Sequence, residues 1–286
     1  MVLSRCRNIG YCDGRIFINS GSICGLSDFS SAGKGAHRQR NRKGVEMDYS
    51  HATNVVDRYK DYGGLAISAM RRLKKIAAML PTSGNLLEIG ALDGATVQYY
   101  KQKFKGKTFG VDISMEVLKD AAKIIDEVKT CDLNVDPLPW EDGFFDVIIC
   151  SEIIEHIFDT DGLLEKIKRV LKPSGTLIIS TPNLASFFNR FFILFGYQPV
   201  GTEVSCVNTR YGNKFRKALR PAGHIRNFTY AAFLDIIRAH GFKIEKISFN
   251  PMSESGIAAV IEAVTSTIRP SLGSVVIVKC SKGVPS

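Results

Sequence analysis

Short apolar runs alternate with amphipathic stretches along the chain from about residue 57 onward. The amphipathic stretches carry apolar residues at spacings of three and four, which predicts helices. The runs between them are short and continuous, which is typical of strands buried on both faces. The predicted helices span residues 66–80, 96–104, 115–125, 162–171 and 230–240. The predicted strands span residues 86–90, 108–113, 128–133, 145–151, 176–181, 242–249 and 275–280.

This alternation predicts an α/β fold, with a Rossmann-like, seven-stranded, mostly parallel sheet and helices on both faces. Residues 183–228 interrupt the rhythm before the last helix, and residues 251–272 interrupt it between the last two strands. We expect residues 183–228 to form a lid-like insertion. The prediction is therefore a single domain over residues 47–286 that carries this insertion.

Residues 1–46 are rich in Gly, Ser and Arg and show no sustained helical or strand period. They lack the continuous apolar region of a secretory signal, so we expect a disordered tail or an upstream extension, with a transit peptide as the alternative. Eight basic and three acidic residues here supply half of the formal net charge of +10. The rest of the chain is only mildly basic, which disfavours a nucleic-acid partner.

The seven cysteines include no C-x-x-C pair and no nearby histidine cluster at zinc-like spacing. A reduced, cytoplasmic setting is the simplest interpretation.

The densest apolar stretch, Phe187–Tyr197, is shorter than the roughly 20 residues that span a bilayer, so no transmembrane segment is predicted. Its phenylalanines are spaced as one helical face. They indicate a helix packed on the domain, an aromatic lid over a hydrophobic acceptor, or a peripheral membrane contact through residues 187–197.

Acidic residues occur at three successive strand ends. Glu88 precedes a glycine-containing loop, Asp112 lies 22 residues beyond Gly90, and Asp132 ends the third predicted strand. Each acid alone is typical of a capping or surface residue. Together they face the cleft where open α/β sheets bind ligands, and a carboxylate at the Asp112 offset can accept both hydroxyls of a ribose.

The chain resembles class I methyltransferases that use S-adenosyl-L-methionine (SAM), over roughly residues 57–250. Among them it is most similar to the branch of ubiquinone-biosynthesis-type O-methyltransferases and unassigned small-molecule enzymes. The matching stretches are LLEIGALDGA, GVDIS, CDLNVDPLPWEDGFFDVIICSEIIEHI, LKPSGTLIISTPN and GHIRNFTYAAFLDIIRAHGF.

The resemblance implies SAM as the cofactor and a set of residues around it. The methionine part of SAM would lie at the glycine loop, its ribose at the second strand end and its adenine at the third. The expected cofactor-binding residues are Glu88, Gly90, Ala91, Gly94, Asp112, Ile113, Asp132, Leu133 and Ser151. The loop departs from the family pattern at Leu92, where a second glycine usually falls, so the contacts of residues 91–93 stay open.

His156 and His224 are the candidate catalytic residues. Methyl transfer is an in-line displacement in which positioning contributes about 7–11 kcal/mol, and a base is needed only for a weakly acidic acceptor. If residues 152–156 are helical, Glu152, Glu155 and His156 share one face. The resemblance implies magnesium there in some relatives, but histidine suits that ion poorly. We predict no metal site, and a purely hydrogen-bonding role for Glu155 and His156 stays open.

These features predict a SAM-dependent methyltransferase that acts on an oxygen or carbon of a small, partly hydrophobic, lipid-like acceptor. The alternatives are a SAM-binding protein without catalysis, an RNA methyltransferase and a nicotinamide-dependent oxidoreductase. The G-x-G-x-x-G loop of the last class is missing. The Asn/Asp-Pro-Pro-Tyr/Phe motif of many base-directed enzymes is replaced by Ser151-Glu152-Ile153. The sequence indicates no oligomeric state.

Overall fold

The computed structural model describes residues 10–12, 15–17, 67–205, 207–215, 222–253 and 256–283. The chain divides into two units, Met1–Met47 and Asp48–Ser286. In the first unit, β1 (Gly10–Cys12) pairs antiparallel with β2 (Arg15–Phe17). The remainder of the predicted tail, and residues 47–66, lie outside the described residues.

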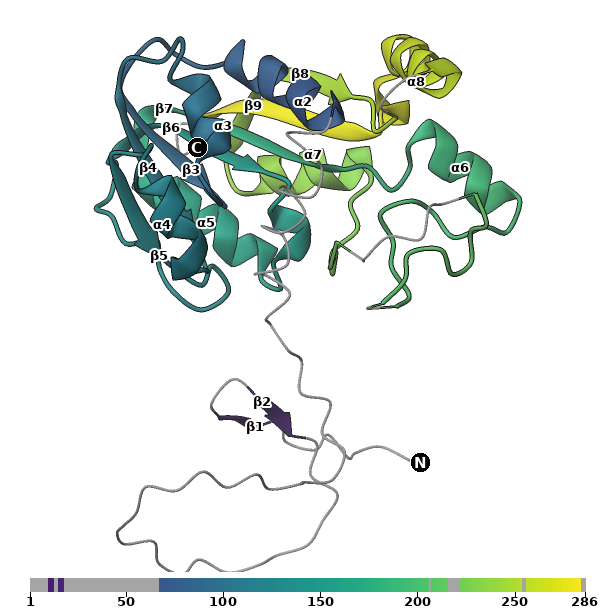
Figure 1. Cartoon of the computed structure of the whole chain (residues 1–286), viewed down its shortest axis with the longest axis horizontal. Helices are drawn as coiled ribbons and strands as arrows, with labels where there is room; N and C mark the ends of the chain where they lie inside the picture. Colours follow the sequence, from purple (N-terminus) through teal and green to yellow (C-terminus); the bar gives the residue numbers. More distant parts are fainter. Residues whose placement is uncertain are drawn as a thin grey trace, which may run out of the picture. The chain divides into compact units, whose positions relative to one another are not determined.

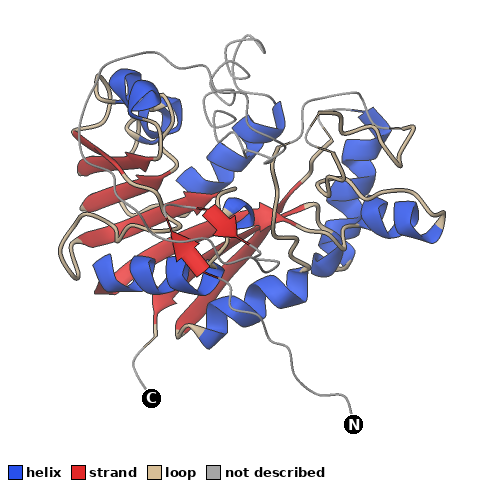
Figure 2. Cartoon of the chain, turned by 90° about the horizontal axis from the view of Figure 1, so that it is seen from below, coloured by secondary structure: helices blue, strands red, loops and turns tan. Residues whose placement is uncertain are grey.

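The second unit contains a seven-stranded sheet in the order β5-β4-β3-β6-β7-β9-β8 (Figure 2). Neighbouring strands from β5 to β7 pair in parallel, while β9 is antiparallel to both β7 and β8. This arrangement confirms the predicted Rossmann-like, mostly parallel sheet. The strands are β3 (Asn85–Ile89), β4 (Lys107–Asp112), β5 (Glu127–Thr130), β6 (Phe145–Ser151), β7 (Leu171–Pro182), β8 (Phe242–Asn250) and β9 (Val275–Lys282).

Helices cover both faces of this sheet (Figure 1). Apolar residues of α2 and α3 pack against Val147, Ile149 and Ile277 on one face. Residues of α5 and α7 pack against the opposite face, where Ile148 and Val278 are also fully buried. The helices are α2 (Ile67–Ala77), α3 (Ala95–Tyr100), α4 (Met115–Ala121), α5 (Thr160–Val170), α6 (Phe187–Leu194), α7 (Tyr230–Ala239) and α8 (Gly256–Ile268), with short 3-10 turns η2 (Ile154–His156) and η3 (Pro270–Leu272).

Three helices begin at side-chain caps that the sequence encodes locally. Ser114 accepts a hydrogen bond from Val117 N before α4, Asp159 accepts one from Gly162 N before α5, and Thr229 accepts one from Ala232 N before α7. Each bond satisfies a backbone N–H that the first helical turn leaves unpaired. The caps therefore fix the residue at which each helix begins after its loop.

One element was not expected from the sequence. Residues 251–272, expected only as an interruption, contain α8, a 13-residue helix. Two basic residues of α2 contact neighbouring backbone, since Arg71 Nη1 donates to Ser253 O and Lys75 Nζ donates to Phe249 O. Long basic side chains can pack their stems on a neighbouring element while the cation finds an acceptor.

Asn183 fixes the start of the predicted insertion. Its side chain is buried, and Nδ2 donates to Ser271 O (3.0 Å) and Gly273 O (2.7 Å). Its Oδ1 accepts from Ala185 N and Tyr230 N, both at 3.0 Å. One amide therefore ties together the end of β7, the start of α7 and the turn before β9.

We expect Asn183→Ala to lower the free energy of unfolding by roughly 2–4 kcal/mol, because it leaves buried backbone groups without partners. Urea unfolding measures this change. Asn183→Asp is the matched control: it keeps the acceptor oxygens but sets a carboxylate against two carbonyls, so it should not restore stability. Full stability of Asn183→Asp would show that the donor bonds are unimportant.

Candidate functional site

The loop after β3 turns tightly across the end of β4. Gly90 N and Ala91 N both donate to Val111 O, at 2.8 and 3.0 Å. Gly90 has φ 76°, and a Cβ at this position would lie 2.3 Å from Ile153 Cδ1. Only glycine fits both the backbone conformation and this close approach. The turn therefore requires Gly90 for its own geometry, whatever it binds.

Leu92 stands where the resemblance led us to expect a glycine, and it has φ 46°. A non-glycine residue in the left-handed region stores strain of about 1 kcal/mol or more and persists where its surroundings impose it. Here Leu92 N donates to Asp112 Oδ2 at 3.2 Å. The loop thus keeps the shape that a glycine would give it, held from the end of the neighbouring strand.

The Asp112 carboxylate lies at the end of β4 among backbone donors. Its Oδ1 accepts from Ser114 N at 3.1 Å, and its Oδ2 accepts the bond from Leu92. Burial raises the pKa of Asp112, and hydrogen bonds from backbone N–H groups partly offset this effect. This carboxylate joins two loops and is placed to accept further donors from a ligand in the cleft.

Glu88 is buried under the loop, within β3. Thr96 Oγ1 donates to Oε1 at 3.4 Å, whereas Oε2 has no hydrogen-bond partner among the described residues. Burial raises the pKa of Glu88 to about 8, and the hydrogen bond from Thr96 and the charge of Arg72 oppose the rise. A buried carboxyl with an unpaired oxygen can receive a cationic or hydrogen-bond-donating group.

Glu152 corrects the expectation of a helical face over residues 152–156. It has φ 59°, a conformation outside a helix, and only Ile154–His156 form a 3-10 turn. Its carboxylate accepts from Ser180 Oγ at 2.9 Å and lies 3.7 Å from Arg72 Nη1. Glu152 therefore bonds to β7 and pairs with α2, while its charge still acts on the neighbouring Glu155.

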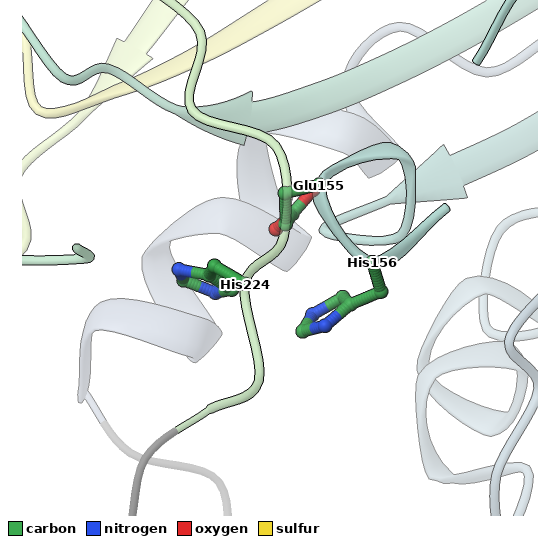
Figure 3. A group of neighbouring side chains, drawn as sticks. All are labelled: Glu155, His156 and His224. Atoms are coloured by element: carbon green, nitrogen blue, oxygen red, sulfur yellow. The ribbon is translucent and has the colours of Figure 1, made fainter. Parts of the chain in front are cut away.

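His156 and His224 come together although 68 positions separate them in the sequence. Their ring centroids are 4.9 Å apart, and the Glu155 carboxyl lies beside them (Figure 3). His156 Nδ1 contacts Gly223 O at 3.1 Å, and His224 Nδ1 contacts Gly201 O at 2.9 Å. Because a carbonyl only accepts, both Nδ1 atoms carry a proton, which makes each Nε2 the basic nitrogen.

Glu155 is buried at the centre of this group. Thr181 Oγ1 donates to its Oε2 at 3.1 Å, and Oε1 has no hydrogen-bond partner within the described part of the chain. Burial, followed by the charge of Glu152, raises the pKa of Glu155 well above its usual value. Its backbone carbonyl accepts from Ile225 N and Arg226 N, which holds the segment carrying His224 against η2.

A small pocket of about 10 Å³, room for about one water molecule, lies beside these groups. Its lining combines the buried Glu155 and the half-buried His224 with apolar residues of the insertion. The lining residues are Glu155, Pro182, Leu184, Val200, Gly201, His224, Arg226 and Asn227. The insertion therefore contributes both apolar and polar walls of the pocket, and the predicted catalytic residue His224 is one of them.

The ligand atoms of Glu155, His156 and His224 lie within 4.8 Å of one another, close enough for one metal ion. The set does not fit the magnesium site that the resemblance implies, since Glu152 points elsewhere and only one carboxylate remains. One carboxylate with two imidazoles is a donor set typical of zinc or iron. The groups also have hydrogen-bond partners of their own, as described above.

The remaining predicted cofactor residues lie at the ends of β4, β5 and β6. The Ile113 side chain is exposed, Asp132 Oδ1 accepts from Asn134 N, and Leu133 O accepts from Lys166 Nζ. Ser151 Oγ lies 3.0 Å from Ser180 Oγ. The structure thus places these residues along one edge of the sheet, beside the Gly90 and Asp112 loops.

Sequence reasoning missed Arg72 and Thr181 as members of the site. Arg72 reaches from α2 toward Glu88, Glu152 and Glu155, and it lowers the pKa of Glu88 and Glu155. Its position in a basic run of an amphipathic helix gave no signal of this role. Thr181 continues an apolar strand, where a hydroxyl group attracts no special interpretation.

Residues 63–247 match a family model described as a methyltransferase domain, which covers more than half of the chain. The chain therefore belongs to this methyltransferase family. The family and the fold are those of the SAM-dependent methyltransferases, which implies S-adenosyl-L-methionine as the cofactor.

The relatives agree with this assignment. A ubiquinone biosynthesis O-methyltransferase of Coxiella burnetii is 30% identical over 138 residues, which are 46% of this chain and 56% of the relative. The chain spans about half the length of the curated relatives that it matches. A SAM-dependent methyltransferase from Archaeoglobus fulgidus shares the fold at TM-score 0.54 and 17% identity, covering 82% of this chain and 100% of its own. One from Thermotoga maritima does so at TM-score 0.52 and 20% identity, covering 82% and 98%.

Glu88 should make stability depend on pH. Its folded-state pKa of about 8 exceeds the ordinary value of 4.5, so the folded state alone binds this proton between these values. Its contribution to the free energy of unfolding therefore falls as pH rises, by about 1.4 kcal/mol per unit, up to pH 8. Glu88→Gln should abolish this slope and be the more stable protein at pH 8, as measured by urea unfolding. If the free energy of unfolding changed with pH in the same way in both proteins, the raised pKa assigned to Glu88 would be wrong.

Proposed function

We propose that the chain transfers the methyl group of SAM to an oxygen, or a carbon, of a small and partly hydrophobic acceptor. The observation that carries this proposal is the pair of imidazoles of His156 and His224, whose ring centroids lie 4.9 Å apart next to a small pocket that His224 lines together with apolar residues. Such a lining suits an acceptor with one polar, ionisable group on an apolar body.

The cofactor would occupy the edge formed by the loops after β3, β4 and β5. Glu88 is placed for the ammonium group of the methionine part, because its buried Oε2 needs a donor. Asp112 would accept the ribose hydroxyls, and Asp132 with Leu133 would frame the adenine. When bound, SAM supplies an electrophilic methyl group whose bond to sulfur breaks as the bond to the acceptor forms.

His224 would receive the proton that the acceptor loses. Its Nδ1 proton is held by Gly201 O, which leaves Nε2 as the basic atom, and the residue lines the pocket. Glu155, buried beside it, would stabilise the positive charge of the imidazolium that forms. His156 would orient the acceptor and keep water out of the pocket.

An RNA acceptor has less support. The pocket is small and partly apolar, and among the described residues that line it Arg226 is the one permanent cation and His224 the one ring-bearing side chain on which a base could stack. Three free thiols, Cys131, Cys150 and Cys280, are buried among the described residues, which agrees with the cytoplasmic setting that we propose. No helix in the described ranges is long and apolar enough to cross a membrane.

We expect Asp112→Ala to weaken SAM binding by at least tenfold, because two ribose hydroxyls lose a charged acceptor. Isothermal titration calorimetry measures the dissociation constant. Asp112→Asn keeps one acceptor for Leu92 N, so its dissociation constant for SAM should lie between those of the wild type and Asp112→Ala. Unchanged affinity in Asp112→Ala would show that the ribose lies elsewhere.

The test of the transfer reaction is a screen of phenolic, lipid and glycan extracts with SAM labelled in its methyl group. With the acceptor found, His224→Gln should lower kcat by 10²–10⁴-fold, the usual contribution of a general base, and leave SAM affinity unchanged. His240→Gln, a histidine bonded to Ile236 O at the end of α7, is the control and should retain activity. Equal activity of the two variants would remove His224 from the mechanism.

A further inference from the structure

Helices α6 and α8 lie at the same end of the domain (Figure 1). Seventeen large apolar side chains are exposed among the described residues, and twelve of them belong to residues 191–215 or 257–268. We call these twelve the apolar end: Phe191, Ile193, Leu194, Phe195, Val204, Val207, Tyr211, Phe215, Ile257, Val260, Val264 and Ile268. These twelve side chains fall on two segments of the chain, and exposed apolar side chains that gather in this way mark interaction surfaces.

Helix α8 turns its apolar face outward. Ile257, Val260, Val264 and Ile268 follow helical spacing along one face, and all four are exposed. The buried side holds Glu262, whose carboxylate accepts from Ser274 Oγ at 2.8 Å and Ser253 N at 3.0 Å. These bonds attach the polar side of the helix to the domain, so the outward orientation is built into the fold.

Helix α6 is arranged in the same way. Its buried residue is Asn189, whose side chain exchanges two hydrogen bonds with the backbone of Val200, at 2.7 and 3.0 Å. Phe191, Ile193 and Leu194 are left on the outside. The Asn183 side chain bonds to Ser271 O and Gly273 O, and so joins the segment before α6 to the turn after α8.

The charges around the apolar end have one sign. Arg190, Arg210, Lys214 and Arg269 are exposed there. The acids of the described residues in 183–215 and 256–273 are Glu203 and Glu262, and neither is freely exposed. Glu203 accepts from Ala222 N and Gly223 N, and Glu262 is buried.

We propose that the apolar end docks on the surface of an anionic lipid bilayer, with α6 and α8 lying in the interface. An apolar helix face bordered by cations binds such surfaces through buried apolar area and attraction to anionic headgroups. A second copy of the chain fits less well, because a two-fold interface would set these four cations against their own equivalents. The proposal extends the expectation for residues 187–197 to a second helix, and it does not depend on the proposed reaction.

Vesicle co-sedimentation with the full chain, without cofactor or acceptor, tests this docking. We expect binding to phosphatidylglycerol-containing vesicles to be at least tenfold tighter than to phosphatidylcholine vesicles. The double variant Leu194→Glu with Ile268→Glu should lower the partition coefficient at least tenfold. Val135→Glu is the control: Val135 is 73% exposed, against 77% for Leu194, but lies outside the apolar end. An equal loss in Val135→Glu would overturn the proposal.

The cations are tested separately. Arg190→Gln with Arg269→Gln should lower the partition coefficient roughly fivefold per charge, the contribution typical of a basic residue at an anionic surface. Lys119→Gln with Lys123→Gln changes two exposed cations at α4 and should have no effect. Absence of vesicle binding, together with a dimer in light scattering that Leu194→Glu dissociates, would assign the surface to a second copy instead.

Discussion

Strand β3 lies between β4 and β6, and its parallel pairing on both sides is the constraint on which the site depends. Glu88 pairs with Gly110 on one side and Ile149 on the other, so Gly90, Asp112 and Ser151 emerge at the same edge of the sheet. The loop after β3 then bends over β4 through the two bonds to Val111 O. A register shift of one residue in β4 would turn Asp112 to the opposite face. Strand register therefore brings the predicted cofactor-binding residues to one edge of the sheet, and the loop sequences act on residues that are already close together.

Two buried carboxyls give this edge its chemical character. Glu88 and Glu155 each keep one oxygen without a hydrogen-bond partner among the described residues, and burial raises the pKa of both. A folded protein gains no stability from such groups, since burying a charge without full pairing is unfavourable. Arg72 reduces the penalty only in part. The arrangement is consistent with groups kept for a ligand and a reaction, where stability is given up for function.

The sequence pattern predicted the sheet well because β3, β6 and much of β7 and β9 are apolar runs buried between two layers. The edge strands β5 and β8 are only partly buried. Some residues of the candidate site could be predicted from the sequence and others could not. Asp112 and the loop could be located by their offsets from strand ends, but the conformation of Glu152 could not, because φ 59° in a non-glycine residue is imposed by tertiary contacts. Arg72 and Asn183 act through partners 80 or more positions away, as with Arg72–Glu152 and Asn183–Ser271. No local pattern carries such information. Helix α8 was missed because Glu262 is its one charged residue and apolar residues stand on its outward face as well.

The insertion reaches from the pocket to the outer surface through α6, the helix whose buried side is polar and whose outer side is apolar. Leu184 and Val200 line the pocket, and the intervening α6 is held by Asn189 through hydrogen bonds instead of apolar packing. An amide that bonds to a fixed backbone segment specifies orientation strongly but buries little apolar area. Phe191, Ile193 and Leu194 on the outer side of α6 are therefore available to a partner without loss of the bonds that hold the helix. A segment built in this way can keep the pocket in shape while its far side contacts an apolar phase, so acceptor binding and surface attachment need not compete for the same side chains.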